Sequence, residues 1–439
     1  MPQKELSFKL EFSGAEKITP YAGLGLYGEL YRSLGLHREI TGVLPRPKSG
    51  AGYDANTYVY PVTLMFIGGG KYLEDIRKIE TDKGLREMCG IATVPSSDAI
   101  GDWLRRESME KQAGIGQIND SIVKRMIRRS ADENLTLDID ATGIEADKYE
   151  AAYTYKGYKG YMPLLGFIPE IGCCAGYEFR EGNVPPAARN YEFTKGICEK
   201  AERWGRRIGN MRSDSAAYQA GVMNYCHGND IRYTITADHD EAVMRGIRNI
   251  PATDWKPVHD KDGVRTGREY AEFIHTMNES DHSFRMVVQR WPNPQRDLFE
   301  QHEEYCYHVI ATDFTEEEKI SEEVIWWHNG RANSENYNKE VKLGFNLDYM
   351  PCGEYGANAV WFGIGILAYN LFVASKVFLL PKSWLHKTIG TIRWQFVQIA
   401  GRIIRHAGCL IVRICGISRE IYELYKIGRK RCILLNCSG

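Results

Sequence analysis

The hydrophobic period of this chain changes near residue 134, and this change constrains the fold more than any other feature. In residues 18–128 the apolar side chains recur at three- and four-residue spacing, which predicts helices. From Asn134 the pattern alternates instead, and residues 135–140 read apolar and polar in turn. Alternation of period two predicts a strand. The chain therefore starts with a helical unit and passes into an α/β unit.

The order of the elements after residue 134 narrows the fold class. The strand over 135–140 is followed by predicted strands within 163–180, a helix over 187–207, a strand over 208–212, a helix over 218–225 and a strand over 231–237. Three strands, a helix, a strand, a helix and a strand is the order of a ribonuclease-H-like α/β core. Other α/β folds begin in a similar order, so the pattern by itself leaves them open.

A second interruption follows this core. Strand-like segments over 284–290 and 305–312, joined by polar turns, predict a β-rich insertion, and helical periodicity resumes at Ser321. We therefore expect an α/β protein with helical N-terminal and C-terminal regions. Its predicted parts are a helical N-terminal region (1–130), the first part of the core (131–238), the β-rich insertion (239–320), the second part of the core (321–376) and a basic helical C-terminal region (377–439).

The overall charge of the chain indicates no particular partner, but its distribution does. Lys and Arg number 56 and Asp and Glu number 57, which gives a net charge of −1. From Lys376 to the last residue, twelve lysines and arginines stand against only Glu420 and Glu423. Such a basic segment can neutralise phosphates.

The cysteines and the apolar stretches indicate a cytoplasmic protein. The eleven cysteines include the adjacent pair Cys173 and Cys174 and show no Cys-x-x-Cys spacing, so we expect reduced thiols. The first residues lack the apolar core of a signal peptide. The most apolar stretch, residues 359–374, is shorter than the ~20 residues of a membrane span and contains polar side chains. We expect it to be a buried helix, with no membrane partner.

Two aspartates stand at the ends of predicted strands. Asp140 ends the strand over 135–140, and Asp214 follows the strand over 208–212 and precedes a helix. Open α/β sheets bind their ligands at the carboxyl ends of the strands. One such aspartate is most often an ordinary solvated side chain, but two on the same sheet can converge on a shared cation.

A third group of residues lies on a predicted helix. His328, Arg331, Glu335 and Lys342 fall within an arc of roughly 60° if each residue turns by about 100°. One helix face would then present a carboxylate flanked by cations, which suits a metal ion and phosphates together. The alternative is a charged solvent face with an Arg331–Glu335 pair at i,i+4 spacing.

This spacing closely resembles the Tyr-x2-Arg-x3-Glu-x6-Lys signature of insertion-sequence transposases with an Asp-Asp-Glu site, the cut-and-paste class that forms DNA hairpins. Every position matches in spacing, and His328 stands where the family usually has Tyr. The resemblance covers roughly residues 135–371. It is also carried by Asp140-Ala141-Thr142, Pro163-Leu164-Leu165, Arg180-Glu181-Gly182-Asn183 and Arg212-Ser213-Asp214-Ser215.

Two nearby acidic residues, Asp138 and Glu340, are alternative candidates for the catalytic carboxylates. Asp138 is followed by Ile rather than by the small residue and Thr that follow the family's first aspartate. Glu340 would point about 140° away from Glu335 on a helix, off the cationic face. We therefore predict Asp140, Asp214 and Glu335 as the catalytic and metal-binding carboxylates.

The resemblance implies a Mg²⁺-dependent transposase that cleaves DNA at transposon ends and joins the freed ends to target DNA, through a hairpin intermediate. Two Mg²⁺ ions about 4 Å apart would act at the site, with Mn²⁺ as a substitute. Asp140 would bridge both ions, and Asp214 and Glu335 would hold one each. Arg331 and Lys342 would bind the backbone of the transposon end, and His328 could donate a hydrogen bond to a phosphate.

The same resemblance implies the partners. These are double-stranded DNA, as terminal inverted repeats and as target, and a second copy of the chain in a homodimeric synaptic complex. The helical N-terminal region would bind DNA, and the protein would associate with a bacterial nucleoid.

A hairpin requires a base to leave the stack, and an aromatic ring from the β insertion would receive it. Tyr307, twenty-one residues before His328, is our first choice. Trp291, in a Trp-Pro turn, is the second, and the alternative for Tyr307 is an ordinary core tyrosine.

Two further functions stay open. A ribonuclease-H-like nuclease that only hydrolyses DNA would keep the three carboxylates but would not need Arg331 and Lys342 on the cationic helix face or the basic C-terminal tail. An inactive DNA-binding relative of a transposase would not need the carboxylates, all of which are present.

Overall fold

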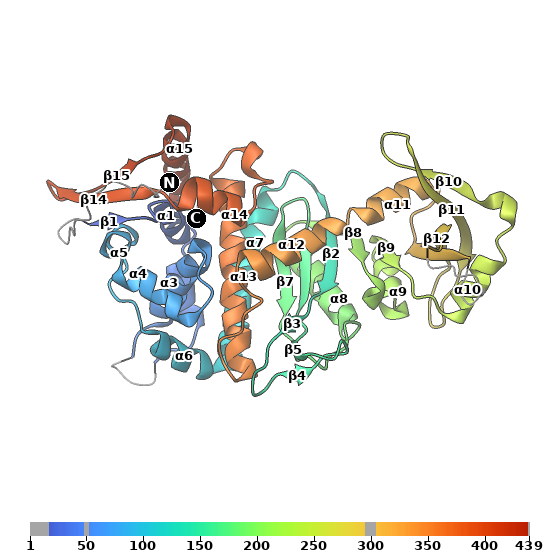
Figure 1. Cartoon of the computed structure of the whole chain (residues 1–439), viewed down its shortest axis with the longest axis horizontal. Coiled ribbons are helices and arrows are strands. Elements are labelled where there is room, and N and C mark those ends of the chain that lie inside the picture. The colour runs from blue at the N-terminus through green and yellow to red at the C-terminus, as the bar shows by residue number, and fades with distance from the viewer. Residues whose placement is uncertain (1–16, 48–51, 295–303, 438–439) are drawn as a thin grey trace, which may run out of the picture.

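The computed structural model of the chain describes residues 17–47, 52–294 and 304–437 and is centred on a nine-stranded mixed sheet (Figure 1). Its strand order is β10-β11-β12-β13-β9-β8-β2-β6-β7. The strands are β2 (Asn134–Ala141), β6 (Leu164–Ile168), β7 (Cys173–Glu178), β8 (Arg207–Ser213), β9 (Arg232–Thr236), β10 (Lys256–His259), β11 (Arg265–His275), β12 (Phe284–Pro292) and β13 (Tyr305–Thr312).

The half of this sheet that contains β2 matches the strand pattern of the sequence. β2 runs antiparallel to β6 and parallel to β8, and β8 runs parallel to β9. All five residues of β6 are buried, as expected for a strand covered on both faces. The helices α8 (Asn190–Arg203) and α9 (Ala220–Gly228) form at the places predicted for them.

The β insertion continues the same sheet. β13 pairs antiparallel with β9, with Ile310 opposite Thr236 and Thr312 opposite Thr234. The sequence predicted β12 and β13 but missed β10 and β11, because β11 is largely exposed and shows little apolar alternation. Figure 1 shows β10–β12 at the opposite end of the molecule from the C-terminal helix.

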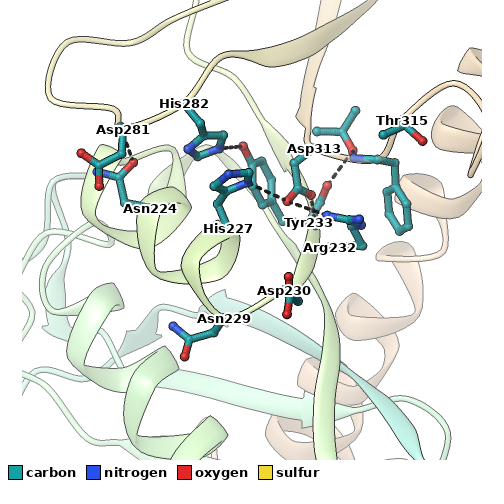
Figure 2. A network of polar contacts seen from close by, with 12 residues as sticks. Asn224, His227, Asn229, Asp230, Arg232, Tyr233, Asp281, His282, Asp313 and Thr315 are labelled. Atoms are coloured by element: carbon teal, nitrogen blue, oxygen red, sulfur yellow. Dashed lines mark hydrogen bonds and ion pairs between the residues drawn. The ribbon is translucent and has the colours of Figure 1, made fainter.

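A polar network holds the insertion against the core (Figure 2). The Tyr233 hydroxyl on β9 and Nε2 of His282 in the insertion lie 3.0 Å apart in a hydrogen bond. The amide of Asp281 donates to Asn224 of α9 at 2.9 Å, and Asp313 accepts from the amide of Tyr233 at 3.0 Å. Contacts to Tyr233 of β9 and to Asn224 of α9 therefore hold the insertion against the core.

The N-terminal region is helical, as its periodicity predicted. Side chains of Asp54, Asp82 and Ser96 accept hydrogen bonds from the first turns of three of its helices, which satisfies amides that have no helical partner. The elements are α1 (Leu24–Ser33), α2 (Leu36–Val43), α3 (Ala55–Gly68), η1 (Leu73–Asp75), α4 (Ile76–Thr81), α5 (Lys83–Cys89), α6 (Ser97–Arg105) and α7 (Ser108–Arg129).

The most apolar stretch forms the buried helix α13 (Tyr355–Phe378). This helix is long and apolar enough to cross a membrane, but its apolar window is entirely buried inside the protein. Asn370 ties it to two neighbours, accepting from the amide of Cys174 at 3.0 Å and donating to Asn119 at 3.2 Å. The helix thereby joins the N-terminal helices to the sheet.

The C-terminal region is not wholly helical, which corrects the expectation for 377–439. After α14 (Ile389–Ile392) and the π-helical turn η6 (Arg393–Val397), the chain forms the hairpin β14 (Ala400–His406) and β15 (Cys409–Cys415) and ends in α15 (Arg419–Cys437). Ala407 and Gly408 both have positive φ, 47° and 77°, the geometry of a two-residue hairpin turn. β1 (Ile18–Thr19) pairs with β14, so the start of the described chain joins the C-terminal region in one small sheet.

Candidate active site

Asp140 and Asp214 leave neighbouring strands at one edge of the sheet. β2 and β8 are parallel, and Ile139 lies opposite Ser213, so the next residue on each strand is one of the two aspartates. Asp214 then caps the short helix η2 (Ser215–Ala217), accepting from the amide of Ala216 at 3.1 Å. The pairing that the sequence predicted for these two carboxylates is therefore present at this edge.

The surroundings of Asp140 disfavour its negative charge. Burial, followed by the charge of Asp214, raises the pKa of Asp140 to about 7, and the charge of Glu335 acts in the same direction. Arg331 and a hydrogen bond from Asn338 act against the shift. A buried carboxylate that feels the charges of two further carboxylates is stabilised in its charged form by a cation, so the chemistry of these side chains suits a divalent metal ion.

Helix α12 (Ala332–Lys339) brings the third carboxylate to this edge. Asn338 donates from Nδ2 to Oδ2 of Asp140 at 2.5 Å, and Glu335 lies three residues earlier on the same helix face. The Asn338 amide oxygen is buried and has no hydrogen-bond partner among the described residues, which leaves one more oxygen able to face a cation. Sequence reasoning missed Asn338, although its i+3 spacing from Glu335 was a usable signal.

The carboxylate of Glu335 lies apart from those of the two aspartates. Its side chain is 67% exposed and lies 3.9 Å from Nη2 of Arg331, the i,i+4 pair that the sequence offered as an alternative. Within the described residues, no three acidic, His or Cys side chains stand close enough to hold one metal ion. Asp140 and Asp214 are therefore neighbours at the ends of adjacent strands, whereas the carboxylate of Glu335 is turned toward Arg331.

Lys342 reaches the same edge by a route that the sequence did not indicate. The α-helix ends at Lys339 and continues as a π-helical turn, η4 (Glu340–Gly344), so the residues from His328 to Lys342 do not lie on one regular helix. Nζ of Lys342 donates to the carbonyl of Gly143, just beyond Asp140, at 2.5 Å. Burial lowers the pKa of Lys342, and the charge of Asp140 opposes that shift. The amine thus lies beside the candidate site, bound to a backbone carbonyl.

His328 lies at the end of α11 (Ser321–Asn329) and is 2% exposed. Its Nδ1 is 2.9 Å from the hydroxyl of Thr234, and its Nε2 is 3.0 Å from that of Thr236. Burial lowers the pKa of His328 to about 3, so the ring is neutral. Because both nitrogens bind β9, the structure does not support the predicted phosphate contact; His328 instead fixes α11 to the sheet.

The two aromatic candidates lie on opposite faces of the insertion. Trp291 is opposite Cys306 and Tyr307 is opposite Arg290, so Trp291 and Tyr307 project to different sides. Trp291 also lies within strand β12 rather than in the turn that the sequence suggested.

Helix α11 packs on the face that carries Trp291. Val324 and Ile325 of α11 pack with Val287, which precedes Trp291 by four residues on the same face. Tyr307 packs against the other core cluster, with Val309. The geometry thus places Trp291, rather than the favoured Tyr307, on the face of the insertion that α11 covers.

Cationic groups surround this face of the insertion. The guanidinium of Arg268, on β11, lies 4.4 Å from the centre of the Trp291 ring. Burial lowers the pKa of His308 to about 4, and the charges of Arg268, Arg331 and His239 act in the same direction. Sequence reasoning missed Arg268, because no local pattern connects a residue of β11 with a helix more than sixty residues later.

The two competing acids are engaged elsewhere. Asp138 is fully buried and forms two hydrogen bonds with Arg212, at 2.7 and 2.8 Å. Glu340 accepts from the amide of Ile389 at 2.6 Å. Burial raises the pKa of Glu340, and the charges of Lys376 and Arg393 oppose the shift. Both acids therefore have structural partners away from Asp140.

Comparison with known proteins gives the family. Residues 2–427 match the sequence model of a family described as transposase DDE domain group 1. Among solved structures, the chain is similar to a piggyBac transposase in a synaptic complex with hairpin DNA, determined by cryo-EM. The alignment covers 95% of this chain and 80% of the piggyBac transposase chain, at 10% sequence identity and with a TM-score of 0.45. No curated protein matches the sequence. Because the family model spans nearly the whole chain, this protein belongs to the transposase DDE domain group 1 family.

Proposed function

We propose that this protein is a metal-dependent DNA transposase, a polynucleotidyl transferase that cleaves transposon ends and transfers the freed ends into target DNA. The observation that carries the proposal is the meeting of Asp140 and Asp214 at one sheet edge, with the helix of Glu335 bonded to Asp140 through Asn338. Membership of a DDE transposase family supports the same reaction class.

We also propose that the strands around β2 form a ribonuclease-H-like core. What supports it is the order β7-β6-β2-β8-β9, in which the pairs on one side of β2 are antiparallel and those on the other side are parallel. In such a sheet the ends of β2 and β8 present their side chains at a common edge. The proposed core therefore accounts for the position of both aspartates.

Divalent metal ions are the usual cofactors of DDE transposases. We propose Mg²⁺, two ions per site with Mn²⁺ as a substitute, held by Asp140, Asp214 and Glu335. Mg²⁺ favours a few carboxylates together with water and phosphate oxygens, which suits this set. When bound, the ions would stabilise charge on the attacking and leaving oxygens of a phosphodiester.

The protein's own side chains would position the DNA. The planar guanidinium of Arg331 suits a bidentate phosphate contact once Glu335 has turned away, and the amine of Lys342 adds a point charge beside Asp140. Trp291 would receive a base extruded during hairpin formation, with Arg268 stacked on its other side. The partners would be transposon-end and target DNA and a second copy of the chain.

The test is cleavage of end DNA in the presence of Mg²⁺. We expect Asp140→Asn to reduce cleavage by at least about a hundredfold while end binding is largely kept, because metal ions act on the transition state more than on docking. Asp230→Asn is the matched control, since that carboxylate is 87% exposed and precedes β9 at the other end of the parallel strands. Normal cleavage by Asp140→Asn would remove this residue from the site.

A strand-transfer assay separates the proposal from the remaining alternatives. With a pre-cut end that carries a free 3′-OH, a transposase joins the end to target DNA, whereas a nuclease that only hydrolyses DNA leaves it unjoined. An inactive relative would bind the end and do neither. Inverted repeats on both sides of the reading frame would independently support the transposase.

A further inference from the structure

A small three-stranded sheet follows β2 directly, and we call residues 144–161 the tyrosine flap. Its strands are β3 (Ile144–Glu145), β4 (Ala152–Tyr153) and β5 (Lys159–Tyr161), in the order β3-β5-β4. Tyr161 anchors the flap, because this residue is fully buried and its hydroxyl accepts from Asn358 of α13 at 3.0 Å. The flap is therefore anchored to α13 through its last residue.

Three tyrosine side chains of the flap are nevertheless exposed to solvent. Tyr149 is 87% exposed, Tyr153 70% and Tyr155 66%. A single exposed aromatic residue is ordinary, but a cluster of large exposed rings on one anchored segment is typical of an interaction surface. Tyrosine is suited to such surfaces, because its ring stacks while its hydroxyl stays hydrated.

The flap adjoins the candidate active site. The hydroxyl of Tyr158 occupies the place where a Cβ on Gly143 would stand, so this position accepts only glycine without a shift of the ring. The carbonyl of Gly143 binds Lys342, and the charges of both Lys156 and Asp140 act on the amine of Lys342. Lys156 of the flap therefore lies near enough to Lys342 for their charges to interact.

The flap has no net charge, so the positions of its unpaired charged side chains decide which ligands it can bind. Asp147 is paired with Lys159 at 3.4 Å, and Glu150 accepts from the amide of Tyr355 at 2.6 Å. Among the described residues Lys156 forms no ion pair, and its amine lies 5.5 Å from the centre of the Tyr155 ring. The exposed end of the flap thus presents a cation next to an aromatic face.

We propose that the tyrosine flap binds the DNA strand that passes the active site, with Lys156 on a backbone phosphate and Tyr155 stacked on an unpaired base. The inference rests on the proposed function, since it assumes that DNA reaches Asp140. A cation beside an exposed ring is the combination that single-stranded nucleic acid requires. A protein partner on this surface would cover the edge where the DNA must enter, so DNA is the occupant that the position favours.

The experiment measures binding by fluorescence anisotropy, with chelator present so that no cleavage occurs. The probe is a fluorescein-labelled duplex with a single-stranded 3′ extension, compared with the same duplex with blunt ends. Lys156→Ala should lower the salt dependence of binding by about one phosphate contact. Tyr155→Ala should weaken binding of the extended probe about tenfold or more and leave the salt dependence unchanged, while Tyr155→Phe should bind normally.

The matched controls are Lys195→Ala and Tyr191→Ala, a pair on α8 whose amine lies 5.9 Å from the ring centre. We expect both to bind like the wild type. Wild-type binding by Lys156→Ala and Tyr155→Ala overturns the flap proposal even if Asp140→Asn abolishes cleavage, and the proposed function then stands alone. If the flap variants change sedimentation of the free protein but not DNA binding, the surface is a protein interface and the proposal is also wrong.

Discussion

Asp138 and Asp140 stand two residues apart on β2, and their carboxylates have opposite surroundings. Asp138 is neutralised by Arg212, whereas Asp140 is buried beside Asp214 and near Glu335. Breaking a buried ion pair leaves the partner's charge uncompensated, so we expect Asp138→Asn to lower the free energy of unfolding by about 3–5 kcal/mol. Asp140→Asn removes an unfavourable charge and should raise the melting temperature of the metal-free protein.

Urea unfolding in the presence of chelator measures the free energy of unfolding of each variant, and thermal unfolding under the same conditions measures the melting temperature. Glu318→Gln is the control, because Glu318 pairs with Arg232 at 2.9 Å at the surface, and we expect a loss below about 1 kcal/mol. Equal destabilisation by Asp138→Asn and Asp140→Asn would contradict the separate roles of the two aspartates.

His328 makes the stability of the fold depend on pH. Its pKa in the folded protein is about 3, below the ordinary value of 6.5, so the unfolded chain takes up the proton first as the pH falls. The stability is complete above pH 6.5 and is lost progressively toward pH 3, by about 2 kcal/mol at pH 5. His328→Gln should reduce this decline in urea unfolding between pH 7 and pH 5, whereas His386→Gln, at an exposed position, should leave it unchanged.

At the scale of elements, the two faces of the insertion separate the roles of its aromatic residues. Trp291 shares a face with α11, and Tyr307 packs on the other side. We therefore expect Trp291→Ala to lose hairpin formation selectively while nicking continues. Tyr307→Ala should lower nicking and hairpin formation together, through a loss of stability. Labelled DNA ends resolve the two steps on a denaturing gel, and selective loss of the hairpin in Tyr307→Ala would reverse the assignment.

At the scale of the whole molecule, the C-terminal region supports the N-terminal helices. The hydroxyl of Tyr425 on α15 donates to the carbonyl of Ala22 at 3.2 Å, and Arg429 pairs with Glu29 at 2.7 Å. The basic composition of the tail predicts that truncation after about Leu380 reduces DNA affinity without affecting metal binding, unless this segment packs as a helix on the catalytic core. We now expect truncation to expose the apolar face of α1 and to make the protein insoluble or sensitive to protease.

Charge changes on intact α15 test its DNA binding without this damage. Lys426→Gln and Lys430→Gln alter exposed side chains, so the melting temperature should stay within a few degrees of the wild type. If these residues contact phosphates, the salt dependence of DNA binding decreases in the double variant. A soluble truncated protein with an unchanged melting temperature would contradict the supporting role of the tail.

The sequence by itself determined the elements whose pattern is local. Apolar alternation over 135–140 and over the segments that became β6, β8 and β9 predicted these strands, because a half-buried or buried strand needs those side chains wherever it pairs. Two antiparallel steps, from β2 to β6 and from β6 to β7, followed by a crossover through α8, make β8 parallel to β2. The neighbouring positions of Asp140 and Asp214 could therefore be predicted, and so could the burial of α13.

The tertiary structure decided which residues meet across long separations. Pairing of β13 with β9, pairing of β1 with β14 and the burial of His328 against Thr234 depend on partners far away in the chain. A shift of one residue in register moves every side chain of a strand to the other face, so periodicity could not rank Trp291 against Tyr307. The π-helical turn that directs Lys342 to Gly143 has no local signature, and only the packed fold fixes it.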